Sequence, residues 1–206
     1  MHLEKRIFDI VVSLLALVLF SPFILSIIIG MALEGIFSPP SRGKIFYSET
    51  RISAGEPFKI YKFRIFKKEG LNRVLKAGQF VHTKELEKDI NNLTHAGRFL
   101  KKIYMDELPQ LVNVLKGEMT LVGPRPTNII NYERLITERK YAKYLMRAGL
   151  IGYYQSHKGI KIHKNQEELD MEYINFCQDN PGWKVILYDI KIIFITILTV
   201  LRAEGA

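Results

Sequence analysis

The sequence predicts a mainly helical α+β chain: a membrane helix that enters and leaves on one side, a small β-hairpin, and interfacial amphipathic helices around a compact domain. Three observations predict this class. Residues 10–33 carry no charged side chain, residues 44–66 alternate apolar and polar positions around a turn, and residues 107–116 repeat leucine and valine at helical spacing. In a chain of 206 residues, we expect a membrane element with its flank over residues 1–40 and one cytoplasmic domain over residues 41–206.

The composition combines a soluble part with an apolar part. Hydrophobic residues make up 48% of the chain and charged residues 25%, which excludes both a disordered tail and a protein of many membrane spans. The net charge of +9 favours partners that carry phosphate, such as nucleic acid, nucleotides or anionic lipid. Nucleic acid is not expected, because the sequence has no aromatic platform or basic recognition helix. Cys177 is the only cysteine, which excludes an intrachain disulfide and a zinc site of several cysteines.

The apolar run from Ile10 to Leu33 would reach roughly 36 Å as a straight helix, enough to cross a bilayer. Pro22 removes one backbone donor near its middle and predicts a kink into two arms. The Ser21 hydroxyl or a neighbouring helix must then satisfy the backbone group that Pro22 frees. Because cations on both flanks favour the cytoplasmic side, a helix that bends and returns is expected; a cleaved signal peptide is the alternative. The flanking cations are Lys5, Arg6, Arg42, Lys44 and Arg51.

Shorter elements follow the apolar run. The hairpin over residues 44–66 is expected to turn at residues 53–55. Residues 67–93 are polar and rich in lysine, and they predict a solvated excursion with a helical stretch around 84–90. A helix over 107–116 is expected to begin after Asp106 as its N-cap.

The second half of the chain predicts further elements. Residues 119–122 read as a strand, residues 128–146 as helical, and Gly149 with Gly152 as a turn.

The C-terminal segment 183–202 is strongly apolar, but only residues 192–201 of it are uncharged, which is too few to span a membrane. At about 100° per residue, Lys184, Lys191 and Arg202 project from one face. The pattern favours a helix that lies in the headgroup plane, with its cations at the phosphates of anionic lipids. A core helix of the domain is the alternative, because the apolar stripe is wide.

Asp106 and Glu107 are adjacent acids at the expected start of a helix, where free N–H groups and the positive end of the dipole favour carboxylate and phosphate. A carboxylate in this position is expected to stay ionised. It can attack a phosphoryl group and form an acyl phosphate, while its neighbour holds the divalent cation that neutralises a diphosphate. By itself the pair also fits an ordinary helix start.

Three cations are candidates for phosphate binding. Arg125 stands between two prolines, and because the residue before a proline is held extended, its guanidinium has a fixed direction suited to a bidentate grip. A bridge from Arg125 to a nearby acid is the alternative. Lys62 and Arg64 alternate with aromatic residues on the expected second strand and therefore share a face. By spacing alone, these two cations also fit a half-exposed strand.

The sequence contains several specific motifs. They are DELPQLVNVLKGEM at 106–119, VGPRP at 122–126, PFKIYKFR at 57–64, the helix-breaking pair Ser21-Pro22, and the D-x-x-Y formed by Asp170 and Tyr173. Together they closely resemble the bacterial sugar transferase family of monotopic phosphoglycosyl transferases. The resemblance covers nearly the whole chain.

The resemblance implies an enzyme at the cytoplasmic face of the bacterial inner membrane, in the first membrane step of glycan assembly. It implies transfer of a sugar phosphate from a nucleotide diphosphate sugar, with UDP as the expected nucleotide, to a polyprenyl phosphate such as undecaprenyl phosphate. Asp106 is implied as the nucleophile that forms a covalent phosphosugar intermediate, and Asp106 with Glu107 as ligands of Mg²⁺. The residues implied in substrate binding are Lys62, Arg64, Lys101, Arg125 and Asp170.

Three features depart from the family pattern. Lys101 stands where the family has an arginine, and a lysine lacks the bidentate fork. The segment 147–156, RAGLIGYYQS, lacks the family's proline and threonine, and the excursion over 67–93 is longer than usual. The donor sugar and the pathway therefore do not follow from the resemblance. A catalytically silent membrane-bound module that binds nucleotide or lipid in a glycan assembly complex is the alternative to an enzyme, and self-association is left open.

Overall fold

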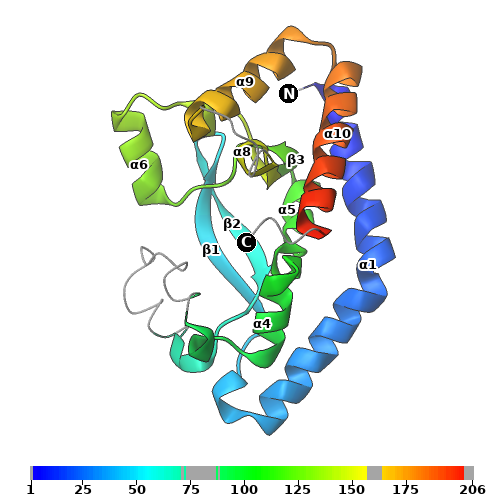
Figure 1. Ribbon diagram of the computed structural model, residues 1–206, viewed down its shortest axis with the longest axis vertical. Helices are drawn as coiled ribbons and strands as arrows, with labels where there is room; N and C mark the ends of the chain where they lie inside the picture. The colour runs from blue at the N-terminus through cyan, green and yellow to red at the C-terminus, as the bar shows by residue number, and fades with distance from the viewer. Residues whose placement is uncertain (1, 71, 73–86, 88, 157–163, 202–206) are drawn as a thin grey trace. The chain divides into compact units, whose positions relative to one another are not determined.

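The computed structural model describes residues 2–70, 72, 87, 89–156 and 164–201 (Figure 1). This part of the chain is mainly helical and has two small sheets, so the predicted α+β class is confirmed. The expected boundary at residue 40 stays a prediction. The chain forms two compact units: unit 1 is Met1–Leu15, Arg51–Phe58 and Leu111–Ala206, and unit 2 is Ala16–Thr50 and Lys59–Gln110.

The apolar run forms helix α1, Leu3–Phe37, which continues through Pro22. Its length and apolar composition would allow it to cross a membrane, and no other helix in the described part of the chain meets both conditions. Pro22 has no N–H to donate to the Val18 carbonyl, four residues earlier. The Ser21 hydroxyl donates to that carbonyl at 2.7 Å instead. The predicted compensation by Ser21 is thus confirmed, while entry and return on one side of a membrane stays a prediction.

The hairpin is formed by β1, Phe46–Ser53, and β2, Glu56–Phe63, as predicted. The predicted strand after the acidic motif is also confirmed as β3, Met119–Gly123.

The turn predicted at Gly149 and Gly152 was wrong, because both residues belong to strand β4, Ala148–Gly152, which pairs with β3 in parallel. A Cβ on Gly149 would lie 2.2 Å from the Gly123 nitrogen, so this glycine permits the close approach of the two strands. The partner strand is distant in sequence, and no local pattern reveals such pairing.

The region predicted as helical over 128–146 contains two helices, α6 and α7. The helix expected around residues 84–90 lies mostly outside the described residues. The other helical elements are η1 Pro39–Ser41, η2 Ile90–Asn92, α4 His95–Lys102, η3 Met105–Glu107, α5 Gln110–Lys116, α6 Ile129–Thr137, α7 Ala142–Leu145, α8 Tyr153–Ser156, α9 Gln166–Asp179 and α10 Gly182–Leu201.

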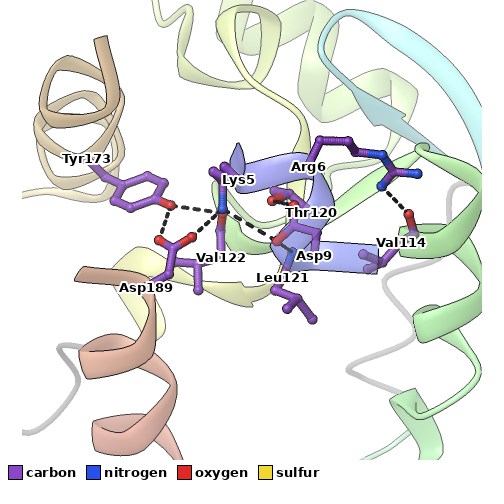
Figure 2. Close-up of polar contacts among 9 residues, drawn as sticks. All are labelled: Lys5, Arg6, Asp9, Val114, Thr120, Leu121, Val122, Tyr173 and Asp189. Carbon is purple, nitrogen blue, oxygen red and sulfur yellow. Dashed lines mark hydrogen bonds and ion pairs between the residues drawn. The ribbon is translucent and has the colours of Figure 1, made fainter. Parts of the chain in front are cut away.

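A buried network of charges holds the N-terminal part of α1 within unit 1 (Figure 2). Lys5 is 1% exposed and forms ion pairs with Asp189 of α10 and, at 3.7 Å, with Asp9. Asp9 also accepts a hydrogen bond of 2.6 Å from the Thr120 hydroxyl of β3. The Tyr173 hydroxyl of α9 donates to Asp189 at 2.5 Å. Every charge in the network therefore has a partner, as burial requires.

The second cation of the N-terminal flank, Arg6, is also used inside unit 1. Its guanidinium donates to the Val114 carbonyl at 2.6 Å and to the Leu115 carbonyl at 2.8 Å (Figure 2). These carbonyls lie in the last turn of α5, where an arginine satisfies groups that the helix leaves free. Lys5 and Arg6, two of the flanking cations expected near the membrane surface, therefore also form bonds within unit 1.

Unit 2 is built on a small apolar core that joins α1 to the hairpin and to α4. Ile27 and Met31 of α1 pack with Phe63 of β2 and Leu100 of α4. All four side chains are buried. The core fixes α4 against the C-terminal arm of α1.

Helix α10 has two different apolar faces. Val185 and Ile192 are buried, whereas a second stripe at helical spacing is exposed. The buried stripe fits the alternative of a core helix, and a position in the headgroup plane stays a prediction. Lys184 and Lys191 are exposed, and Arg202 lies outside the described residues. The exposed stripe consists of Trp183, Leu187, Ile190, Phe194 and Ile197.

Candidate active site

The acid pair lies on the short 3₁₀ turn η3, between α4 and α5. The helix after it begins at Gln110, so the prediction that Asp106 is the N-cap of this helix was wrong. Tyr104 precedes the turn in the left-handed region, with φ 56°, a conformation that costs a non-glycine residue energy. Met105 and Leu108 pack against the core on α1. The turn is therefore restrained by the backbone conformation of Tyr104 before it and by the packing of Met105 and Leu108.

Asp106 is buried within this turn and 9% exposed. Burial raises the pKa of its carboxyl to about 6, the charges of Glu107 and Glu87 add to the rise, and Lys62 opposes it. The predicted stabilisation by a helix dipole is absent because the helix starts later. At neutral pH the carboxylate is still mostly ionised, but it is a destabilised anion, which favours reaction with an electrophile or binding of a cation.

Glu107 and Lys62 form an ion pair beside Asp106. The Lys62 ammonium donates to the Glu107 carboxylate at 3.0 Å, and both side chains are largely buried, at 23% and 15% exposed. Lys62 lies on β2, as the hairpin predicted. The positive charge of Lys62 opposes the rise in the pKa of Asp106.

Lys101 lies in the last turn of α4 and has its own acidic partner. Its ammonium is 3.4 Å from the Glu87 carboxylate and donates to the Glu87 carbonyl at 2.8 Å. Glu87 belongs to the excursion that is longer than in the family pattern. Lys101 is thus placed near the turn with its charge partly neutralised.

Arg64 does not share the environment of Lys62. It is 3% exposed, and its guanidinium donates to the Lys44 and Ser41 carbonyls, each at 2.6 Å, and to the Phe66 carbonyl. Each of its three nitrogens has a backbone partner, so Arg64 holds together the chain on either side of the hairpin. Spacing could not show that the side chain turns inward, and a contact between Arg64 and substrate stays a prediction.

Arg125 and Asp170 belong to unit 1, whereas Lys62, Lys101, Asp106 and Glu107 belong to unit 2. Arg125 is half-buried in the loop after β3, where Gly149 N–H donates to the Pro124 carbonyl at 2.9 Å. That bond ties the rigid proline segment to β4.

Asp170 is fully buried in α9, and its carboxylate accepts a hydrogen bond of 2.6 Å from Lys143 of α7. Tyr173, one turn later, is also fully buried and hydrogen-bonded to Asp189. The D-x-x-Y motif therefore supports the packing of α9 within unit 1. A contact between Asp170 and substrate stays a prediction.

The family model for bacterial sugar transferases matches residues 1–203. The chain belongs to the bacterial sugar transferase family. This confirms the family that the motifs indicate, and with it the expectation that the chain is a transferase enzyme.

The names of three relatives describe a sugar transferase or a sugar-phosphate transferase. "Uncharacterized sugar transferase EpsL" of Bacillus subtilis is 35% identical over 98% of this chain and 89% of its own length. The "Undecaprenyl-phosphate galactose phosphotransferase" of Salmonella typhimurium is 34% identical over 98% of this chain and 41% of its own length. The "UDP-glucose:undecaprenyl-phosphate glucose-1-phosphate transferase" of Escherichia coli is 32% identical over 95% of this chain and 40% of its own length. The chain therefore spans less than half the length of the last two relatives.

Two polar residues of the sugar transferase were missed by sequence reasoning. Gln110 is 2% exposed, and its amide nitrogen is buried with no hydrogen-bond partner among the described residues. Its position four residues after Asp106 was the sequence feature that could have pointed to this residue. Glu34, at the end of α1, binds the N-terminus of α4. No pattern in the neighbouring sequence could have indicated this contact between Glu34 and α4, because the two segments are distant in the chain.

The acid pair of the sugar transferase fits a magnesium ion. Mg²⁺ takes oxygen ligands, and proteins often hold it with one or two carboxylates plus substrate phosphates. Asp106 supplies a buried carboxylate whose raised pKa would fall beside a cation. No cluster of three His, Cys, Asp or Glu side chains occurs in the described part of the chain. Asp106 and Glu107 would thus share the ion with phosphate oxygens and water.

Proposed function

We propose that this sugar transferase moves a sugar phosphate from a UDP-sugar to undecaprenyl phosphate, or a similar polyprenyl phosphate, at the cytoplasmic face of the bacterial inner membrane. Relatives named for this reaction align with nearly the whole chain. The observation that carries the proposal is the buried carboxylate of Asp106, on a turn that packs against the apolar helix α1. In this proposal, the lipid-borne phosphate reaches the carboxylate from the membrane side of α1.

The chemistry proceeds in two displacements at one phosphorus atom. A carboxylate oxygen of Asp106 bonds to the phosphorus that carries the sugar, and the bond to the bridging oxygen of the diphosphate breaks. Nucleoside monophosphate leaves with that electron pair. A phosphate oxygen of the lipid then bonds to the same phosphorus, the acyl phosphate bond breaks, and Asp106 is free again. The order predicts ping-pong kinetics.

The cations indicated by the motifs prepare this phosphorus for attack in the proposal. Lys62, paired with Glu107, keeps positive charge beside the reacting carboxylate. Arg125 and Lys101 bind phosphate oxygens of the donor in this proposal. Asp106 and Glu107 would hold magnesium, whose charge offsets that of the diphosphate.

Contacts at the two ends of α1 support the membrane arrangement in this proposal. Near its N-terminus, Lys5 and Asp9 are bonded to α10 and β3. Near its C-terminus, Glu34 is bonded to α4. Both ends of the apolar helix are therefore bonded to segments that follow it in the chain. These contacts support a helix that enters and leaves on the cytoplasmic side.

The exposed surfaces of α1 and α10 support membrane contact. Large apolar side chains along α1 are exposed, including Val18 at 65% and Leu19 at 74%. Water is a costly environment for such a surface, and lipid is not. On α10, the exposed Lys184 and Lys191 flank an apolar stripe and suit anionic headgroups.

The proposed reaction is tested with the full chain in nanodiscs that contain undecaprenyl phosphate. A panel of UDP-sugars is screened for release of UMP, with excess chelator as a second condition. We expect release with at least one sugar, and loss of release in chelator that returns when Mg²⁺ is added. An absence of UMP with every sugar would contradict the proposal, and full activity in chelator would remove the metal from it.

A further inference from the structure

Glu34 ends the uncharged stretch of α1 and joins it to the helix that leads to the acid pair. Its carboxylate accepts hydrogen bonds from the backbone N–H groups of His95, at 2.8 Å, and Ala96, at 2.9 Å. It also accepts a bond of 2.7 Å from the Ser41 hydroxyl. The two N–H groups belong to the first turn of α4, so one side chain of α1 satisfies donors that this helix cannot satisfy itself.

The bonds from Glu34 complete the N-terminus of α4. The Thr94 hydroxyl accepts from the next amide, that of Gly97, at 2.8 Å. A Cβ on Gly97 would lie 2.2 Å from the Ile65 carbonyl oxygen, so α4 is pressed against the end of the hairpin. Near its other end, Leu100 is buried against the C-terminal arm of α1. The helix is thus fixed at several points along its length.

From α4 to Asp106 the chain has little freedom. Lys102 ends α4, and Tyr104 follows in the left-handed region. A residue other than glycine keeps that conformation only when the structure on both sides imposes it. On one side the restraint is the packing of Met105 and Leu108. On the other side it is α4, whose N-terminus Glu34 holds.

We propose that Glu34 is a positioning residue for the acid pair, which it holds in reacting geometry by clamping the N-terminus of α4 to the end of the membrane helix. This inference rests on the proposed function of Asp106. Without the clamp, the first turn of α4 frays, Tyr104 relaxes toward an ordinary conformation, and Asp106 moves.

A second group reinforces the clamp. The Ser41 carbonyl accepts from the buried guanidinium of Arg64, while the Ser41 hydroxyl donates to Glu34. Arg64 therefore supports the clamp through Ser41. The end of α1, the hairpin and α4 are joined through these three side chains.

The test uses the full chain in nanodiscs without lipid acceptor, so that only the first displacement occurs. The amplitude of the UMP burst counts folded, active sites, and its rate reports the reaction at Asp106. We expect Glu34→Ala to lower the burst rate by about tenfold, since small misplacements of a reacting group cost this much or more, with the amplitude nearly unchanged. Glu34→Gln keeps an acceptor and should recover most of the rate. Glu69→Gln removes an exposed carboxylate from the same unit and serves as the control.

Hydrogen exchange gives a readout that does not depend on turnover. Peptides that cover residues 95–108 should exchange faster in Glu34→Ala than in the parent or in Glu69→Gln. Unchanged exchange would overturn the proposal, as would an unchanged burst rate. A loss of amplitude at an unchanged rate would also overturn it, because Glu34 would then only stabilise the fold. If the parent chain itself gives no burst, the proposed function fails, and exchange alone decides whether the clamp exists.

Discussion

Replacing Asp106 by asparagine should abolish turnover and stabilise the protein. The carboxyl has an ordinary pKa near 3.8, and the structure raises this to about 6. The difference corresponds to roughly 3 kcal/mol against the ionised form in the folded state. An amide avoids that penalty, but its buried donors need partners, which costs about 1–2 kcal/mol. A net gain of about 1–2 kcal/mol in the free energy of unfolding is therefore expected at pH 8.

The pH dependence identifies the origin of this gain. Because the folded-state pKa lies above the unfolded value, the penalty is fully present above about pH 6 and is lost as the pH falls toward 3.8. The stability difference between Asp106→Asn and the parent should therefore shrink between these two values. The UMP burst rate of the parent should also fall at low pH, at a value below about 6, because bound Mg²⁺ lowers the pKa of Asp106.

The stability assay is thermal denaturation of the full chain in nanodiscs over a range of pH, in chelator. UMP release is measured separately, with Mg²⁺ present. Chelator is needed because a bound cation would offset the penalty in the parent. Glu69→Gln, at an exposed position, should show no pH-dependent difference. The reasoning is refuted if Asp106→Asn is no more stable than the parent at pH 8, if its difference does not change with pH, or if it retains more than a few per cent of UMP release.

Three further predictions concern phosphate binding, the buried network and the membrane helix. Arg125→Lys should lower kcat/KM by about tenfold, because an ammonium keeps the charge but loses the fork; unchanged steady-state constants would remove Arg125 from the site. Lys5→Met should reduce the free energy of unfolding by about 3–5 kcal/mol, because it leaves the buried Asp189 without its cation; equal thermal midpoints would contradict this. The double variant Ser21→Leu with Pro22→Ala should shift α1 toward a true span. The test places single cysteines at positions 3 and 44, with the native cysteine replaced by serine, and labels intact cells with a membrane-impermeant thiol reagent. Both positions should resist labelling in the parent, and position 3 should become labelled in the double variant. Labelling of position 3 in the parent would contradict re-entry.

Local sequence signals determined much of the fold and the family. The uncharged run predicted α1, and alternation around Ala54-Gly55 predicted the hairpin. Even the compensation for Pro22 by the preceding hydroxyl followed from the sequence, because donor and acceptor lie within one helical turn. The motifs around Asp106 and Arg125 predicted a sugar transferase, which the family match confirmed. Each of these signals lies within a few neighbouring residues.

The tertiary structure decided what depends on distant partners. Strand β4 exists because it pairs with β3, and its glycines alone suggested a turn. Arg64 donates to three backbone carbonyls, and Asp170 accepts from Lys143, and residue spacing did not reveal these partners. Asp106 lies on a 3₁₀ turn with a raised pKa because packing on α1 buries it ahead of the helix. Burial and long-range hydrogen bonds set the environment of a charge, and a linear pattern of residue types does not contain them.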